Sequence, residues 1–313
     1  MMNKPRIVVS LPNANAYLRE QAILAKSAGG RLGFEMEVMH AGDDAITQSQ
    51  QLLNIIHSRT ERRPTAFIVE PLTGAGLRRV AQAAVADGIA WVISNCDVDY
   101  IPQLRTGAKT PVFAVTQGQM EIGRLQGRQI AALLPEGGSV LFIQGASTSP
   151  VATQRREGME STKPRSVGIT TVRSSWSQEV AFRAVSAWLQ LATSRAEKFA
   201  LVAGQTHELT LGARAAFENI GDREQSRKWL ALPFIGIGIA PQVRPLVDRG
   251  VLATAVFSSL TMELALKLLH DALRTKVQPA ECTRVEASSY PALENLRPFK
   301  RSCEGLLETK SFR

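Results

Sequence analysis

The chain has 313 residues, of which 44% are hydrophobic, 37 are lysine or arginine and 28 are aspartate or glutamate. This length leaves room for two hydrophobic cores, and this composition excludes an intrinsically disordered protein. The net charge of +9 comes from scattered basic residues, and no basic helix, aromatic platform or zinc spacing accompanies it, so no specific nucleic-acid site is expected.

Short apolar runs alternate with amphipathic patterns along nearly the whole chain. Residues 65–70 and 139–143 are typical examples of these runs. Almost wholly apolar runs of this length are typical of strands buried on both faces of a parallel sheet. The alternation therefore predicts an α/β protein with doubly wound parallel sheets. The pattern predicts strands over 6–11, 35–40, 65–70, 90–94, 111–116, 139–143, 167–173, 199–203, 233–237 and 252–257, and helices over 16–31, 44–58, 74–88, 117–134, 150–162, 178–194, 207–219, 241–249 and 259–275.

The number of strand–helix units indicates two similar lobes rather than one sheet. An eight-stranded barrel is the alternative, and it requires a helix between every pair of strands. The connection from Ser94 to Pro111 shows no such pattern, and its Asp97, Asp99, Pro102 and Gly107 are typical of a passage between lobes. The pattern ends after about residue 298, and the charged residues 298–313 are expected to form a mobile tail.

Residues 1–6 lead directly into the first strand, with no apolar region or cleavage site, so no secretory signal is expected. No stretch approaches the roughly 20 apolar residues of a membrane span. Cys96, Cys282 and Cys303 form no C-x-x-C pair, and the four histidines form no metal-binding spacing. We therefore expect a cytoplasmic protein with reduced thiols, or a periplasmic one if a leader has been removed, without a metal or cofactor.

Eight segments form an ordered series of short motifs. They begin with the first strand and its continuation to Leu18, and they end with Gly250-Val251-Leu252-Ala253-Thr254-Ala255-Val256. Taken in order, the segments resemble the type I periplasmic binding proteins, close to ribose-binding protein, over about residues 6–290. The eight segments lie at residues 6–18, 67–72, 88–95, 117–127, 143–159, 209–213, 234–238 and 250–256.

The resemblance implies two Rossmann-like lobes joined by three hinge crossings, with a ligand held between them. The crossings correspond to residues 115–117, 257–259 and 284–287 of this chain. The implied lobes are 1–115 plus 259–283 for the N-terminal lobe and 117–257 plus 285–297 for the C-terminal lobe.

The chain differs from the sugar-binding members of that family at five ligand positions. An Asp-Arg pair after the fourth strand is replaced by Cys96 and Asp97, and an arginine that reaches the sugar is replaced by Thr153. Gly238 stands in place of an aspartate, and Ser258 in place of a glutamine. Because a buried polar group without a partner costs about 1–3 kcal/mol, the resemblance does not imply that a simple pentose or hexose binds in the usual way.

The resemblance places the ligand between the ends of the first and fourth strands on one lobe and the segments after the sixth, seventh and eighth strands on the other. Trp176 matches an aromatic residue that packs on a sugar face in the family, and an indole covers any flat apolar face. The expected ligand-binding residues are Asn15, Tyr17, Asn95, Asp97, Gln144, Thr153, Trp176, Gln205, Thr206 and Ser258.

Several of these residues also have a purely structural interpretation. Asn13 or Asn15 is a candidate cap of the first helix, and Thr206 is a candidate cap of the helix over 207–219. Asn95 and Asp97 stand at a strand end, where both residue types form turns. These alternatives stay open from the sequence alone.

No catalytic set of side chains is apparent. His207 is expected to be solvated in the first turn of its helix, and Cys96 is expected to be a buried thiol because no His–carboxylate set follows it. Gly236 and Gly238 lack the third glycine and the later acidic residue of a dinucleotide loop.

The sequence thus predicts a non-enzymatic protein that closes on a small polar, sugar-like molecule by hinge motion. It would be a solute-binding or ligand-sensing component, with a sensor kinase, regulator or transporter as partner and no membrane insertion. One alternative is the effector-sensing subunit of a transcriptional or two-component regulatory system. The other is an enzyme on the same fold.

Overall fold

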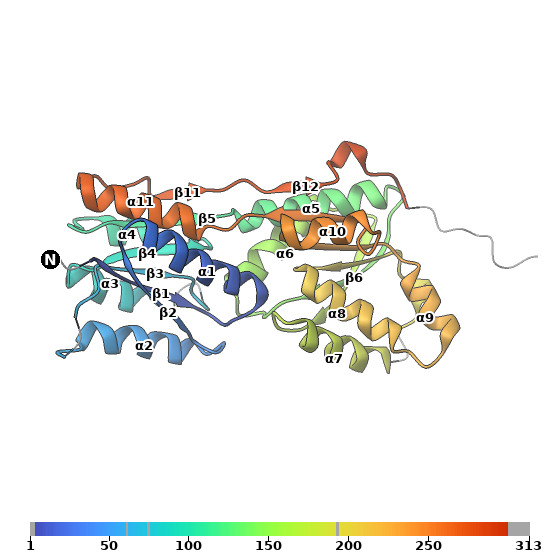
Figure 1. Ribbon diagram of the computed structural model, residues 1–313. Coiled ribbons are helices and arrows are strands. Elements are labelled where there is room, and N and C mark those ends of the chain that lie inside the picture. Colours follow the sequence, from blue (N-terminus) through green and yellow to red (C-terminus); the bar gives the residue numbers. More distant parts are fainter. Residues whose placement is uncertain (1–3, 61, 74–75, 192–193, 300–313) are drawn as a thin grey trace, which may run out of the picture.

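The computed structural model describes residues 4–60, 62–73, 76–191 and 194–299, and it contains two lobes, each built on a six-stranded sheet (Figure 1). Every strand of the first sheet is parallel to its neighbours, in the order β2-β1-β3-β4-β5-β11. The first sheet consists of β1 (Arg6–Leu11), β2 (Glu35–His40), β3 (Ala66–Val69), β4 (Ala90–Asn95), β5 (Val112–Thr116) and β11 (Cys282–Arg284).

The second sheet repeats this order as β7-β6-β8-β9-β10-β12. Its strands are parallel except for β12, which pairs antiparallel with β10. The two doubly wound lobes expected from the sequence are therefore confirmed. The second sheet consists of β6 (Gly138–Gln144), β7 (Val167–Arg173), β8 (Leu201–Gly204), β9 (Phe234–Ile239), β10 (Thr254–Ser258) and β12 (Ser288–Tyr290).

Helices cover both faces of the first sheet, because alternate strand residues point to opposite faces. Ile7 and Val9 pack in the cluster that contains side chains of α1 and α11, whereas Val8 packs in the cluster that contains side chains of α2, α3 and α4. All three side chains are fully buried. The helices are α1 (Ala16–Arg31), α2 (Ala45–His57), α3 (Arg78–Ala86), α4 (Ile101–Arg105) and α11 (Met262–Thr275).

The second sheet is covered in the same way. Val140 and Phe142 pack with α5 and α6, and Leu141 and Ile143 pack with the helices of the opposite face. Those helices are α7 to α10, with the short 3-10 turn Ala196–Lys198 beside them. The helices are α5 (Gln119–Leu133), α6 (Pro150–Thr162), α7 (Gln178–Leu189), α8 (His207–Glu218), α9 (Arg223–Leu230) and α10 (Ala240–Asp248), and a second 3-10 turn spans Leu293–Asn295.

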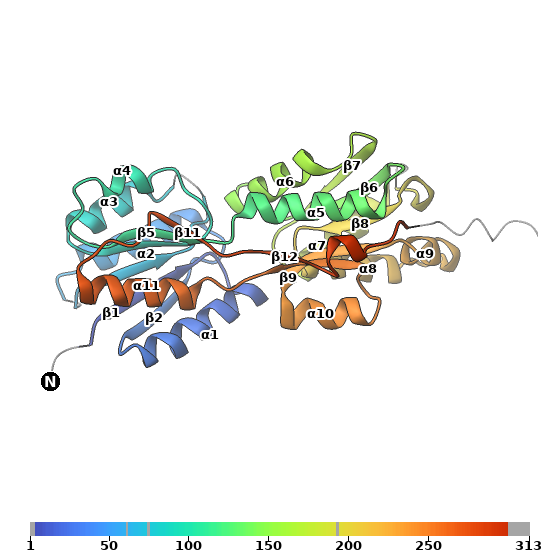
Figure 2. The same cartoon turned by 90° about the horizontal axis from the view of Figure 1, so that it is seen from above.

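The chain passes between the two sheets at three places. The first passage joins β5 to α5, the second joins β10 to α11, and the third joins β11 to β12. Figure 2 shows β11 and β12 as one extended path that runs from the first lobe to the second. The exact lobe limits, 1–115 with 259–283 and 117–257 with 285–297, stay a prediction.

The connection from Ser94 to Pro111 differs from the sequence expectation. It contains the short helix α4, and it joins two strands of the same sheet, so the expectation of a passage between lobes is wrong. A helix of five residues is too short to produce an apolar periodicity that could be recognised.

Three further elements have no counterpart in the sequence prediction. The strands β11 and β12 have three residues each, which is too few for an alternating pattern to be seen. The helix α9 is strongly polar, with only Ser226 and Trp229 buried. Cys303 and the expected tail from residue 300 onward lie outside the described residues.

The helix expected over 74–88 begins later, at Arg78, and two of its expected residues, 74 and 75, lie outside the described part. Within the described ranges, every helix is too short or too polar to cross a lipid bilayer.

Candidate functional site

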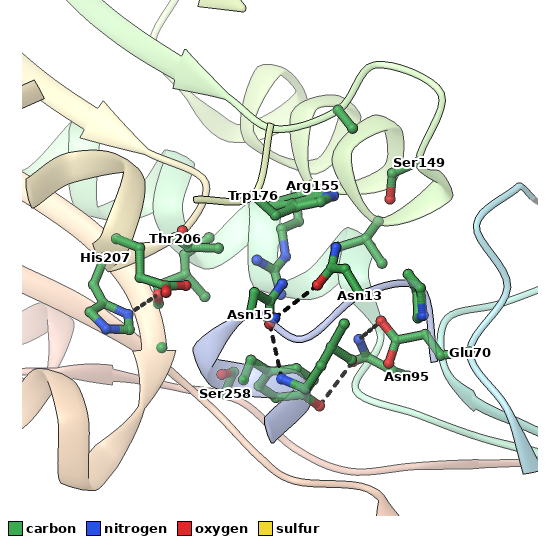
Figure 3. A pocket seen from close by; sticks show the side chains of 18 of the residues that line it. Asn13, Asn15, Glu70, Asn95, Ser149, Arg155, Trp176, Thr206, His207 and Ser258 are labelled. Atoms are coloured by element: carbon green, nitrogen blue, oxygen red, sulfur yellow. Dashed lines mark hydrogen bonds between the residues drawn. The ribbon is translucent and has the colours of Figure 1, made fainter. Parts of the chain in front are cut away.

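A cavity lies between the two lobes, at the carboxyl ends of the strands (Figure 3). It encloses about 780 Å³ of space, part of which is open to solvent. The lining comes from segments that follow β1, β3 and β4 in the first lobe and β6 to β10 in the second. Ligands of open α/β sheets bind at this edge, because the loops that leave the strands converge there.

Six of the ten residues expected from the sequence line this cavity. They come from both lobes, as the expected position of the ligand requires. Whether they bind a ligand stays a prediction. The six are Asn15, Tyr17, Asn95, Trp176, Thr206 and Ser258.

The structure does not bring the other four residues to the cavity. Gln205 is fully buried. Its side-chain amide accepts the backbone N–H of Gly145 at 2.9 Å and donates to the backbone oxygen of Ala152 at 2.8 Å, so it holds these two segments in place. Gln144 accepts a hydrogen bond from Nη1 of Arg156 at 3.0 Å. Thr153 is exposed on α6, and its hydroxyl bonds back to its own helix. Asp97 contacts Cys282 instead, with 3.7 Å between Oδ1 and Sγ.

The capping interpretation is confirmed for two of the lining residues. Oδ1 of Asn15 accepts the backbone N–H of Leu18 at 2.9 Å and caps α1. Oγ1 of Thr206 accepts the backbone N–H of Leu209 at 3.3 Å and caps α8. Because both residues also line the cavity, the N-termini of α1 and α8 both open onto it. The partial positive charge of a helix N-terminus favours an electron-rich oxygen there.

Two charged side chains that the sequence analysis did not select are buried in the wall of the cavity. Glu70 follows β3 in the first lobe and is 7% exposed, and Arg155 on α6 of the second lobe is 6% exposed. Side-chain amides link them: Asn95 donates to Oε1 of Glu70 at 2.8 Å, and Arg155 donates to Oε1 of Gln119 at 2.7 Å. The amide of Gln119 closes the link by donating to Oδ1 of Asn95 at 2.9 Å.

The backbone geometry supports this arrangement at Asn95 and at the α5–α6 contact. Asn95 has a φ of 69°, in the left-handed region that asparagine tolerates better than most residues. A Cβ atom at Gly123 would lie 2.1 Å from the carbonyl oxygen of Arg155, and one at Gly158 would lie 2.0 Å from that of Met120. Glycine at these positions allows the two helices to approach closely enough to hold Arg155 in the wall.

Tyr17 is the centre of a second set of hydrogen bonds, at the hinge. Its hydroxyl accepts from Nε2 of Gln21 at 2.9 Å and from Nε2 of Gln117 at 2.6 Å, and it lies 3.2 Å from the carbonyl oxygen of Ser259. Gln117 in turn accepts the backbone N–H of Ser259 at 2.9 Å. Gln117 and Ser259 belong to two of the three passages between the lobes, so this network connects the hinge to the cavity.

Burial changes the proton affinities of the side chains in the wall. Burial raises the pKa of Glu70 to about 7, although the hydrogen bond from Asn95 and the charge of Arg155 partly offset this effect. Burial lowers the pKa of Arg155 to about 10, so its guanidinium stays charged at neutral pH. Burial, followed by the charge of Glu70, raises the pKa of Tyr17 far above its ordinary value, so the phenol stays protonated.

His207 lines the cavity and is half-buried, so it is less solvated than the sequence predicts. Burial lowers the pKa of its imidazole, and Nδ1 lies 3.3 Å from the carbonyl oxygen of Ile237. Since a carbonyl only accepts, Nδ1 carries the hydrogen and Nε2 is left as an acceptor. A Cβ atom at Gly238 would lie 2.6 Å from Nδ1 of His207, so the imidazole occupies space beside the position where the resemblance places an aspartate.

Trp176 contacts both lobes. It belongs to the second lobe, yet its indole packs against the hydrophobic clusters of the first and of the second sheet. Val151 of α6 also belongs to the cluster of the first lobe. A Cβ atom at Gly145 would lie 2.5 Å from the indole, so glycine makes room for it. The two lobes therefore meet around the cavity, as in a closed conformation.

The sequence contained a signal for one of the two overlooked charged residues, Glu70. Glu70 directly follows an apolar strand, and a charged residue at the carboxyl end of such a strand is placed at the ligand edge of the sheet. Arg155 stands in the sequence as part of a basic pair with Arg156. Its position three residues before Gly158, at the contact with α5, becomes informative only when the helix packing is known.

The described residues contain no group of three or more His, Cys, Asp or Glu side chains that could hold a metal ion. Cys96 is fully buried, as expected, and burial raises the pKa of its thiol well above the ordinary value. A protonated, buried thiol is a poor nucleophile.

A periplasmic binding protein domain model matches residues 7–276. A D-ribose/D-allose-binding protein of Pseudomonas aeruginosa is 26% identical over 256 residues, which are 80% of this chain and 76% of that protein. An ABC transporter solute-binding protein from Bacillus halodurans with bound myo-inositol has a TM-score of 0.77 at 20% identity, with 95% of this chain and 97% of that chain covered.

A fructose-binding periplasmic domain of a hybrid two-component system has a TM-score of 0.74 at 19% identity, with 91% of this chain and 90% of that chain covered. These structures have the same two-lobed architecture as the one described here. The family model covers most of the chain, and its match agrees with the fold, with the three passages between the lobes and with the position of the cavity. This chain belongs to the periplasmic binding protein domain family.

Proposed function

We propose that this protein binds an uncharged sugar or cyclic polyol between its two lobes and closes around it. The observation that carries the proposal is the cavity itself, in which Glu70 and Arg155 are buried beside the indole of Trp176. Charged side chains with free hydrogen-bonding capacity recognise hydroxyl groups, and an indole covers the apolar face of a sugar ring. The ligands of the relatives, which include ribose or allose, myo-inositol and fructose, belong to this chemical class.

The proposal is tested by thermal unfolding with a panel of compounds, followed by titration calorimetry of those that raise the melting temperature. The panel contains D-ribose, D-allose, myo-inositol and D-fructose, with D-glucosamine and D-glucuronate as charged counterparts. A ligand at 100 times its dissociation constant stabilises a protein by about 2.7 kcal/mol, which is readily detected. If no member of the panel shifts the melting temperature, the proposed ligand class is wrong.

The protein acts as a binding component and not as an enzyme in this proposal. Incubation of the purified protein with each bound compound, followed by mass spectrometry, tests the point. Turnover of a bound compound that is lost when Glu70 is replaced would contradict it.

A role in uptake and a role in sensing both require a partner. The relatives include a solute-binding protein of a transporter and a domain of a two-component system, so either a transporter or a sensor protein is a suitable partner. Cross-linking in the native host identifies which of them the protein contacts. Fractionation of the same cells tests the expected cytoplasmic location, since recovery with periplasmic proteins would contradict it.

A further inference from the structure

We propose that Glu70 makes closure of the lobes depend on the ligand: its second carboxylate oxygen accepts a hydrogen bond from a hydroxyl of an uncharged ligand, and without that donor the ionised carboxylate opposes closure. The clause about the ligand rests on the function proposed above. The clause about closure rests only on the surroundings of Glu70.

The two carboxylate oxygens of Glu70 have different surroundings. Oε1 accepts the hydrogen bond from Asn95, but Oε2 is buried and has no hydrogen-bond partner among the described residues. A buried oxygen without a partner loses its interaction with water and gains nothing in return. The loss is greater for a charged group. The closed arrangement of the lobes is therefore unfavourable for an ionised Glu70 that lacks a second donor.

The side chain of Glu70 has little freedom to find another partner. Asn95, which holds Oε1, is itself fixed by three amide hydrogen bonds: Oδ1 accepts from Gln117 at 2.6 Å and from Gln119 at 2.9 Å, and its backbone oxygen accepts from Gln119 at 2.6 Å. In the closed arrangement Oε2 has no surface that solvent reaches, although Glu70 lines the cavity. A donor for Oε2 must therefore come from a molecule that binds while the lobes are open and is enclosed as they close.

The charges around the cavity favour a ligand with no net charge. Arg155 and Glu70 carry opposite charges in the same wall, and each bonds to a side-chain amide. Glu208 also lines the cavity, in the first turn of α8, where the positive end of the helix dipole offsets a negative charge. A cationic ligand would be repelled by Arg155 and an anionic one by Glu70. A hydroxyl group suits both, because it donates to a carboxylate and accepts from a guanidinium.

Glu70 is the group in this cluster whose charge changes near neutral pH. Its pKa is raised to about 7, and the other titratable groups that interact with it are Tyr17, Cys96 and Arg155. Burial raises the pKa of Tyr17 and Cys96, so both stay neutral, and Arg155 with a pKa of about 10 stays charged. Two further titratable groups line the cavity from α8: burial lowers the pKa of His207 and raises that of Glu208. Among Glu70 and the three groups that interact with it, Glu70 is thus the one whose charge changes between pH 6 and pH 8.

The closure clause is tested on the ligand-free protein by small-angle X-ray scattering at pH 6 and pH 8. The radius of gyration of the wild type is expected to increase at pH 8, because the ionised carboxylate opposes closure. In Glu70→Gln the radius of gyration is expected to be the same at both pH values. Glu179→Gln on the exposed surface of α7 is the matched control, and it should behave as the wild type. A wild type that does not open at pH 8, or a Glu70→Gln variant that still opens, would overturn the closure clause.

The ligand clause is tested by calorimetry with the same compounds as in the panel above. The compound that binds best should be uncharged, should close the wild type at pH 8, and should bind Glu70→Gln at least tenfold more weakly than Glu179→Gln. Tightest binding of D-glucosamine or D-glucuronate would overturn this clause. If pH-dependent opening is observed but no compound binds, the proposed function fails while the role of Glu70 in closure stands. Circular dichroism establishes that each variant is folded.

Discussion

The carboxylate of Glu70 in the first lobe is connected to the guanidinium of Arg155 in the second lobe through the side-chain amides of Asn95 and Gln119. The connection contains no direct ion pair, since each charged group bonds to an amide instead. A side-chain amide donates and accepts at the same time, so Asn95 and Gln119 can join the two charged groups in one continuous series of hydrogen bonds. This series makes the position of one lobe depend on that of the other. A change in either charged residue is therefore expected to affect both binding and the relative stability of the closed form.

Replacing Trp176 by Ala is expected to weaken binding of the best compound of the panel about ten- to hundredfold, which corresponds to about 1.4–2.8 kcal/mol. The reason is the loss of a large aromatic surface against the ligand. Titration calorimetry measures the effect. Trp176→Phe should lose less, because it keeps an aromatic face. If Trp176→Ala leaves the affinity unchanged, the ligand does not lie against the indole.

The stability of the protein is expected to fall as the pH rises from about 4.5 to about 7. The folded-state pKa of Glu70 is about 7, above its ordinary value of 4.5, so the folded protein holds this proton more tightly than the unfolded chain. Stability therefore decreases with rising pH in this window, by about 3 kcal/mol at most. Urea unfolding of the wild type and of Glu70→Gln at pH 5 and pH 8 measures the difference between them. If both proteins lose the same stability between these pH values, Glu70 does not ionise in this range.

The architecture follows from the sequence pattern because strands buried on both faces produce continuous apolar runs. The first two predicted strands, 6–11 and 35–40, have the same bounds as β1 and β2, and the helix over 16–31 has the same bounds as α1. The elements that the pattern missed are short or polar, such as α4 and β11. Their formation depends on contacts that are distant in the sequence, which a local pattern does not contain.

The candidate site could be predicted only in part. The resemblance places Trp176 in the site, and the structure does bring it to the cavity. Gln205 has the same residue type as a ligand-binding amide, but its hydrogen bonds go to Gly145 and Ala152, which only the folded backbone brings near it. Arg155 was missed because its burial results from the close contact of α5 and α6. The sequence pattern locates strand ends well and the directions of individual side chains poorly.

Replacing Arg155 by Met is expected to destabilise the protein by about 3–5 kcal/mol, because it leaves Glu70 as a buried charge without its balancing partner. The loss should be larger at pH 8 than at pH 5, since the charge of Arg155 lowers the pKa of Glu70 and its removal raises that pKa further. Urea unfolding at both pH values measures the loss.

The double variant Arg155→Met with Glu70→Gln tests whether this loss comes from the charge of Glu70. It should be more stable than Arg155→Met alone at pH 8, because no uncompensated charge remains. Equal losses in the two proteins would mean that Arg155 stabilises only through its bonds to Gln119 and to the backbone oxygen of Gln205.

Replacing Gly238 by Ala is expected to destabilise the second lobe by about 1–3 kcal/mol, the usual cost of overpacking a well-packed region. The added Cβ atom would lie 2.6 Å from Nδ1 of His207 and 2.6 Å from Cγ1 of Val243. Thermal unfolding measures the loss. Gly30→Ala is the control, since no atom lies within 4 Å of the added Cβ, and alanine in a helix is favoured over glycine.

The double variant Gly238→Ala with His207→Ala separates the two contacts. Removing the imidazole should restore part of the lost stability, because one of the two close contacts disappears while that with Val243 remains. The melting temperature of this variant is compared with that of His207→Ala alone. If Gly238→Ala lowers the melting temperature as much in the His207→Ala background as it does beside the native imidazole, the imidazole does not fill the space at position 238.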